Sequence, residues 1–289
     1  MSDESVRDKA KAVAAAWWDE HYSGKRDPVW RWWESPEVAA YLGGLVCGLP
    51  CSGTADLAVQ GIRAHCAGAL PFARAVSVGC GSAYKEVALL RAGLVRHFTL
   101  YDISTAALAS AQSRAEAAGL AQAVTLVQGD PLDVERGVFD LVYWDNSLHH
   151  MINTRDALAW SRARLKPGGR LVVNDYVGPD RFQWPDDMLA RVNEVIAPFG
   201  VEPTERENPR LIAGADPSEA ADSAATHAAL FAEFPNAAWT PMGGAIYHVG
   251  LTGKIMPLPG LIVARLLRID AKLNEAGMYV YAWASAVKE

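Results

Sequence analysis

The sequence predicts an α/β protein with a doubly wound, mostly parallel sheet and helices on both faces. The first observation is a strand, a glycine turn and a helix in succession over residues 75–90. The second is a strand that ends in Asp102, twenty-one residues after Gly81 of that turn. The third is the alternation of strand-type and helix-type segments up to residue 176, which is typical of right-handed βαβ units.

The glycine turn at 79–81 is suited to binding a nucleotide-like ligand. Glycine lets the backbone approach a ligand closely, and the following helix carries partial positive charge at its N-terminus. The carboxylate of Asp102 can accept hydrogen bonds from both ribose hydroxyls of an adenosine. NAD, FAD and S-adenosylmethionine (SAM) enzymes share these features. The dinucleotide fingerprint has a third glycine where this chain has Tyr84, which disfavours an NAD-type oxidoreductase.

Four motifs together resemble the class I SAM-dependent methyltransferases. They are GCGSA at 79–83, VQGDP at 127–131, FDLVYWDNSLHHM at 139–151 and LKPGGRLVVNDYVGP at 165–179. Ala83 stands where the family usually has its last glycine. The resemblance implies a Rossmann-like seven-stranded sheet of order 3-2-1-4-5-7-6, in which strand 7 is antiparallel. Beyond Pro179 the chain resembles a bacterial subgroup often found with glycan or natural-product tailoring genes.

The resemblance implies SAM as the cofactor and S-adenosylhomocysteine (SAH) as the product. Asp130 would accept a hydrogen bond from the adenine amino group, although it is also a common type of turn aspartate before a proline. Most family members have an acidic residue at the position of Ser77, so weaker SAM affinity or compensation by Glu86 or water would follow. The residues expected to contact the cofactor are Ser77, Gly79, Cys80, Gly81, Asp102, Ile103, Asp130, Pro131, Asp145 and Asn146.

The candidate catalytic residues lie where the fourth and fifth strands are expected to end. His149 and His150 follow the fourth strand, and Asp175 ends the fifth. A histidine oriented by a carboxylate can serve as the base for a hydroxyl or a protonated amine. Packing or loop geometry is the alternative role for both histidines. No metal site is expected, because a Trp-Asp pair followed by LHH does not match the metal-dependent pattern of carboxylates.

The remaining segments are expected to surround the substrate. Residues 1–72 are predicted to form a helical cap, and residues 73–289 the SAM-binding domain with an insertion at about 180–235 that shapes the pocket. The sixth strand is expected near 239–248 and the seventh at 279–287, with a helix over 260–274 between them. The side chains proposed to contact the substrate, or alternatively to pack or form salt bridges, are Tyr176, Arg181, Trp32 and Trp33.

Composition narrows the choice of partner and compartment. The chain has 289 residues, 51% of them hydrophobic, and a net charge of −6, which argues against a nucleic-acid partner. Its four cysteines have no CxxC spacing, so free thiols in a reducing cytoplasm are expected. Neither a signal peptide nor a membrane span is predicted. A homodimer is one possible assembly of the chain.

The sequence therefore predicts a cytoplasmic methyltransferase that acts on a small molecule. A hydroxyl of a sugar or natural product is the favoured acceptor. Methylation at nitrogen or carbon is the nearest alternative, and the residues do not separate these. A methyltransferase fold that binds SAM without transferring a methyl group is a further alternative.

Overall fold

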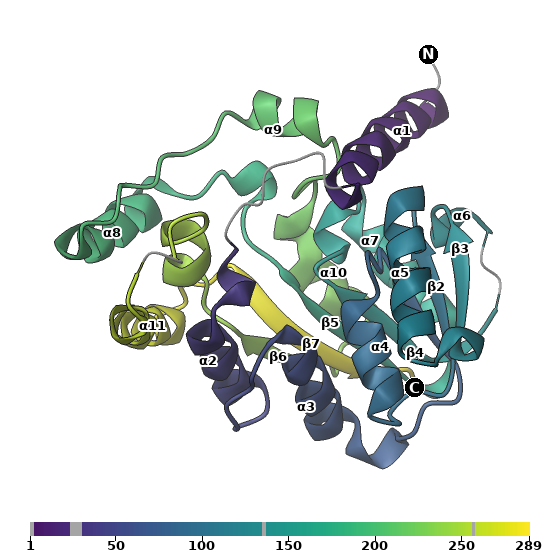
Figure 1. Cartoon of the computed structure of the whole chain (residues 1–289). Coiled ribbons are helices and arrows are strands. Elements are labelled where there is room, and N and C mark those ends of the chain that lie inside the picture. The colour runs from purple at the N-terminus through teal and green to yellow at the C-terminus, as the bar shows by residue number, and fades with distance from the viewer. Residues whose placement is uncertain (1–2, 24–30, 135–136, 256–257) are drawn as a thin grey trace.

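The structure is a computed structural model that describes residues 3–23, 31–134, 137–255 and 258–289 (Figure 1). Its centre is a seven-stranded sheet of order β3-β2-β1-β4-β5-β7-β6. The first five strands pair in parallel, and β7 is antiparallel to both of its neighbours. This confirms the predicted sheet. The strands are β1 (Ala75–Val78), β2 (Phe98–Asp102), β3 (Val124–Gln128), β4 (Phe139–Asp145), β5 (Leu165–Tyr176), β6 (Ala238–Pro241) and β7 (Tyr281–Val287).

Helices cover both faces of the sheet because its central strands are apolar on both sides. Along β4, Leu141 and Tyr143 point into one hydrophobic core, whereas Val142 and Trp144 point into the other. The helices that follow β1 are α4 (Tyr84–Arg91), α5 (Thr105–Ala117), α6 (Pro131–Val134), α7 (Thr154–Arg164), α8 (Asp186–Ile196), α9 (Pro209–Ala215), α10 (Thr226–Glu233) and α11 (Gly260–Glu275).

The predicted N-terminal cap is divided between two places. Helix α1 (Asp3–Tyr22) lies at the end of the sheet where the parallel strands finish, whereas α2 (Pro36–Val46) and α3 (Thr54–Cys66) lie well below it (Figure 1). The apolar side chains of α2 and α3 belong to the same core as those of α4 and α11. These two helices therefore pack with the helices beside the sheet, and a domain boundary near residue 72 stays a prediction.

Helix α1 is attached through the N-terminus of α5. The carboxylate of Asp19 accepts hydrogen bonds from the Ser104 hydroxyl at 2.6 Å and from the backbone N–H of Ala106 at 3.0 Å. A carboxylate at this position satisfies an otherwise unpaired N–H and interacts favourably with the helix dipole. These bonds lower the pKa of Asp19.

The predicted sixth strand is wrong over most of its length. Only Ala238–Pro241 pairs with β7, and residues 245–250 form a π-helical turn. The cause is Asp270 on α11, whose carboxylate accepts hydrogen bonds from the backbone N–H groups of Gly244 at 3.2 Å and Ile246 at 2.7 Å. A distant side chain thus takes over backbone donors that a strand would have used.

Two other expectations concern cysteines and membranes. The four cysteines are free thiols, as predicted. Within the described ranges, no helix combines the length and apolar character that crossing a bilayer requires.

Gly61 is where α3 meets the sheet most closely. We expect Gly61→Ala to destabilise the protein by about 1–3 kcal/mol, because the new Cβ would lie 2.6 Å from Cη2 of the buried Trp283 ring. Gly44→Ala on α2 is the control, since its Cβ would meet nothing within 4 Å. It should stabilise the helix by up to about 1 kcal/mol. Urea unfolding measures the free energy of unfolding of both variants. Equal changes in the two variants would contradict tight packing of α3 on β7.

Candidate functional site

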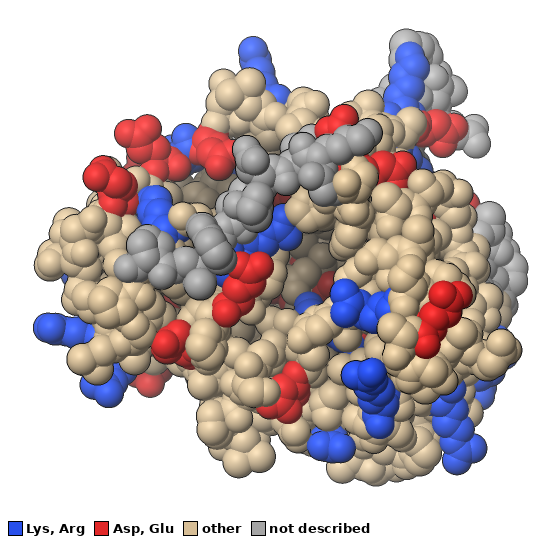
Figure 2. Space-filling view, in the orientation of Figure 1, with Lys and Arg blue, Asp and Glu red and all other residues tan. Residues whose placement is uncertain are grey.

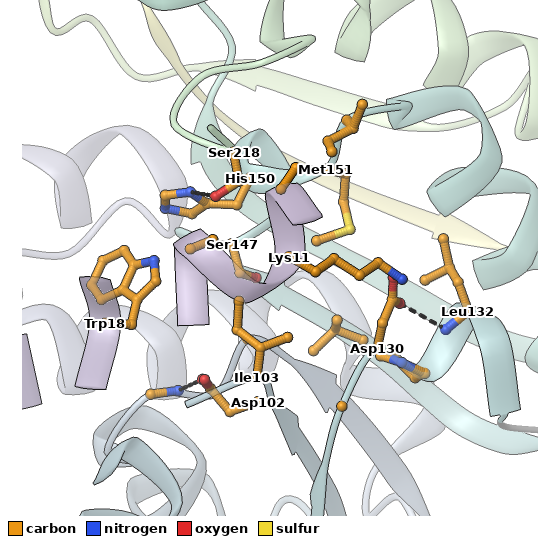
Figure 3. A pocket seen from close by; sticks show the side chains of 18 of the residues that line it. Lys11, Trp18, Asp102, Ile103, Asp130, Leu132, Ser147, His150, Met151 and Ser218 are labelled. Atoms are coloured by element: carbon orange, nitrogen blue, oxygen red, sulfur yellow. Dashed lines mark hydrogen bonds and ion pairs between the residues drawn. The ribbon is translucent and has the colours of Figure 1, made fainter. Parts of the chain in front are cut away.

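A cavity of about 680 Å³ lies at the carboxyl ends of the parallel strands, beneath α1 (Figure 3). Open α/β sheets bind ligands at this edge. One part of its wall comes from the glycine turn and the ends of β2 and β3, namely Gly79, Gly81, Asp102, Ile103, Asp130 and Pro131. Another part comes from α1, the loop after β4 and a distant loop, namely Trp18, Asn146, Ser147, His150, Met151 and Ser218.

The glycine turn has the backbone conformation that its sequence predicts. Gly79 and Gly81 have φ values of 65° and 55°, in the left-handed region that favours glycine. A Cβ at Gly79 would lie 2.8 Å from Cβ of Ser147, and one at Gly81 would lie 2.2 Å from the Tyr22 hydroxyl. The turn therefore needs glycine for space as well as for conformation. Ala83 also adopts a positive φ, 52°, where the family usually has glycine.

Asp102 is held in place beside this turn. Its two carboxylate oxygens accept hydrogen bonds from the backbone N–H groups of Gly81 at 2.8 Å and Ser104 at 2.9 Å. Burial raises the pKa of Asp102, and these hydrogen bonds oppose that shift. The side chain lines the cavity.

Helix α1 forms one wall of the cavity, and the side chains that line it, Lys11, Trp18 and Tyr22, are not the ones named from the sequence. The ammonium group of Lys11 lies 2.7 Å from Oδ2 of Asp130, and Trp18 packs edge-on against His150 with ring centroids 5.3 Å apart (Figure 3). Lys11, Trp18 and Tyr22 are spaced at helical intervals, so they share one face of the helix. That spacing was the available signal in the sequence.

Three residues that were expected to contact the cofactor, Ser77, Cys80 and Asp145, are not among the described residues that line the cavity. The carboxylate of Asp145 is surrounded by donors from Lys85, Tyr143 and Asn174. Cys80 is buried. The hydroxyl of Ser77 donates a hydrogen bond to the Glu86 carboxylate at 2.6 Å. Glu86 thus supplies, from α4, a buried carboxyl group beside the strand position where the family usually has its own acidic residue.

A polar cluster at the other end of the cavity contains the predicted catalytic residues. Nδ1 of His149 forms a short hydrogen bond with the Asp175 carboxylate, and its Nε2 lies 3.5 Å from Oε1 of Glu219. Nδ1 of His150 is 3.1 Å from the Ser218 hydroxyl. The structure therefore brings His149, His150 and Asp175 together, and it adds Glu219 from a loop about seventy residues later.

The electrostatics of this cluster are dominated by its two carboxylates. Burial lowers the pKa of His149, but Asp175 and Glu219 offset this and raise it to about 10. Burial raises the pKa of Glu219, but the neighbouring histidines lower it to about 2. The pKa of His150 is lowered by burial and by the charge of His149.

Three of the four residues proposed to bind the substrate, Trp32, Tyr176 and Arg181, form hydrogen bonds to other parts of the protein and do not line the cavity. The Arg181 guanidinium donates hydrogen bonds to the backbone carbonyls of Pro217 and Glu219, both at 2.6 Å. Nε1 of the buried Trp32 donates to Nδ1 of His248 at 3.2 Å. The Tyr176 hydroxyl donates to the carbonyl of Pro179 at 2.9 Å. These residues hold the cavity wall from behind.

Trp33 differs from the other three proposed substrate contacts. Its side chain is 37% exposed, and the Arg31 guanidinium lies 4.9 Å from its ring centroid. Of the described residues, those that line the cavity include none of Trp32, Trp33, Tyr176 and Arg181.

The buried Glu86 carboxyl group predicts a pH dependence of stability. Burial raises its pKa from 4.5 to about 7, so the unfolded chain releases this proton at lower pH than the folded chain does. Stability is therefore lost as pH rises from about 4.5 through 7, by at most about 3 kcal/mol from this group. Urea unfolding at pH 5 and pH 8 should show a smaller loss for Glu86→Gln than for the wild type. Equal losses would contradict a neutral Glu86.

Comparisons with known proteins agree with the fold described above. Residues 76–173 match the family model described as "Methyltransferase domain". The ribosomal RNA large subunit methyltransferase G of Pseudomonas putida (strain W619) is 32% identical over 129 residues, which are 43% of this chain and 34% of that protein. The chain thus spans about a third of the length of this relative.

Two solved structures resemble nearly the whole chain. Geranyl diphosphate C-methyltransferase from Streptomyces coelicolor A3(2), in complex with Mg²⁺, geranyl diphosphate and SAH, has a TM-score of 0.56 at 15% identity and covers 97% of this chain and 98% of its own. The [4+2]-cyclase SpnF has a TM-score of 0.53 at 17% identity and covers 96% of both chains. They share the fold. The family match covers residues 76–173, the part of this fold that runs from β1 into β5.

Proposed function

We propose that this methyltransferase domain transfers a methyl group from SAM to a hydroxyl group of a small molecule, such as a sugar or a natural product. The observation that carries the proposal is a single cavity of about 680 Å³ that joins the glycine turn to the cluster around His150. This volume is within the range of pockets that hold small ligands, about 300–1,000 Å³.

The residues at the first end of the cavity fit SAM. The glycine turn lines the cavity, and Asp102 presents a fixed carboxylate for the ribose. Asp130 lies farther along the same wall, where the adenine would be bound, and Lys11 pairs with it from α1. SAM supplies an electrophilic methyl group when bound. The protein must then position the acceptor.

The polar cluster marks the acceptor end. Methylation of a hydroxyl forms an oxygen–carbon bond, breaks the carbon–sulfur bond and releases the hydroxyl proton. His149, oriented by Asp175, and the neighbouring His150 are the side chains that we propose to meet the acceptor oxygen. Tyr176 and Arg181 would support this wall, since Arg181 holds the loop that carries Ser218 and Glu219.

The surface favours a small acceptor over RNA. The net charge is −6, and in Figure 2 basic side chains are scattered among acidic ones on the face that contains the hollow. An RNA partner would require a concentrated basic surface. The four free thiols fit a reducing compartment, so we place the reaction in the cytoplasm.

Cofactor binding can be tested by calorimetry with SAM, SAH and NADH. We expect SAM and SAH to bind and NADH not to bind. Asp102→Ala should weaken SAM binding by about 10- to 100-fold, because it removes hydrogen bonds to a charged group. Asp187→Ala, on the exposed start of α8, is the control and should bind SAM normally. Preferential binding of NADH would overturn the assignment of the cofactor.

Methyl transfer can be tested by an acceptor screen that reports SAH release. With an active acceptor, His149→Gln and Asp175→Asn should each lower kcat by about 100-fold or more, the usual effect of losing proton transfer by a positioned group. His227→Gln, at an exposed position on α10, should leave kcat unchanged. Near wild-type turnover in both site variants would mean that catalysis rests on positioning alone.

The screen also separates the alternatives. Products methylated at nitrogen or carbon would change the acceptor class without changing the cofactor. SAM binding without SAH release on any acceptor would support a fold that has lost methyl transfer.

A further inference from the structure

We propose that His149, His150 and Glu219 form a binding site for a divalent first-row transition metal ion. Among the described residues, each of these three side chains offers one ligand atom, and the three atoms lie within 4.8 Å of one another. Metal–ligand bonds of about 2.0–2.2 Å bring such atoms to separations of roughly 3–4 Å. Small side-chain rotations would therefore close the site around an ion.

Both histidines are oriented as metal-binding histidines usually are. A ligating imidazole commonly bonds through its second nitrogen to a carboxylate or another acceptor, which fixes the ring. Nδ1 of His149 is engaged by Asp175, which leaves Nε2 facing Glu219. Nδ1 of His150 lies 3.1 Å from the Ser218 hydroxyl and 3.7 Å from Oδ2 of Asp216.

The supporting carboxylates are themselves buried and fixed. Asp175 is completely buried and accepts hydrogen bonds from the backbone N–H groups of Ser147 at 2.9 Å and Leu148 at 2.6 Å. Asp216 is 2% exposed, and its Oδ1 accepts hydrogen bonds from the N–H and the hydroxyl of Ser218. Each histidine therefore has a rigid acidic group behind it.

Glu219 lies on a loop whose backbone is held by hydrogen bonds from Arg181. Arg181 donates hydrogen bonds to the carbonyls of Asp216, Pro217 and Glu219, so the backbone from 216 to 219 is held from outside the cavity. Asp175 and Glu219 approach His149 from opposite nitrogens, which concentrates negative charge around one imidazole. A divalent cation would neutralise both carboxylates.

The ligand set selects the type of metal. Two imidazoles and one carboxylate suit Zn²⁺, Fe²⁺ or Co²⁺, whereas Mg²⁺ and Ca²⁺ prefer oxygen ligands alone. The motifs predict no metal site, because they match no carboxylate pattern at the strand ends and Glu219 comes from a loop outside them. Three protein ligands leave coordination positions open. His150 lines the cavity, so an open position can face it.

The consequence for catalysis rests on the proposed function, although metal binding itself does not. An acceptor whose hydroxyl coordinated the ion would lose its proton more easily, because a bound cation stabilises the alkoxide. The metal would thereby favour acceptors with exposed oxygen donors, such as sugars.

Metal binding can be measured without any acceptor. The full-length chain, without a histidine tag, is treated with a chelator and titrated with Co²⁺, whose visible absorption reports coordination. We expect one Co²⁺ per chain, displaced by Zn²⁺ but not by Mg²⁺. Glu219→Gln and His150→Gln should weaken binding on the order of 100-fold, and Asp175→Asn by about 10- to 100-fold through the orientation of His149.

Matched controls distinguish this site from adventitious binding. His227→Gln and Glu205→Gln change exposed residues and should bind Co²⁺ as the wild type does. Urea unfolding of Glu219→Gln and His150→Gln with the cooperativity of the wild type would show that these variants are folded. No saturable Co²⁺ binding, or equal binding by the wild type and both site variants, would overturn the proposal.

Discussion

The buried carboxylate of Asp175 determines the geometry on which the rest of the site depends. It ends β5 and accepts hydrogen bonds from the backbone of Ser147 and Leu148, so it fixes the loop that follows β4. That loop places Ser147 against Gly79 of the glycine turn and His150 in the cavity wall, while His149 bonds to Asp175. One buried charge, fully supplied with donors, therefore links the cofactor end to the acceptor end.

The two ends of the cavity differ in how they are built. The proposed cofactor end comes from consecutive strand–turn units, in which the cavity-lining residues lie at the end of a strand or within three positions after it. The acceptor end requires α1, the loop after β4 and the loop at 216–219 to meet. Contacts such as Asp19 with Ser104, and Arg181 with the carbonyl of Glu219, hold these distant segments together.

This difference explains what could be predicted from the sequence. The sheet order, the glycine turn and the placing of His149 near Asp175 follow from local patterns and from the rule that parallel strands end at one edge. The division of the cap could not be predicted, because helical segments alone do not indicate which surface they cover. The π-helical turn at 245–250 depends on Asp270, and Glu219 reaches the cluster through a loop that the distant Arg181 holds, so no local pattern marks either feature.

The same construction separates cofactor binding from acceptor choice. The turn at 79–81 is confined by Tyr22 and Ser147, so substitutions there would disturb several packed segments at once. The loop at 216–219 is held by Arg181 through its backbone carbonyls and, from within, by the buried Asp216 carboxylate, which accepts hydrogen bonds from Ser218. Because Arg181 bonds to the carbonyl of Glu219 and not to its side chain, substitutions at Glu219 can change the chemistry of the proposed acceptor end while the fold and the proposed cofactor end stay intact.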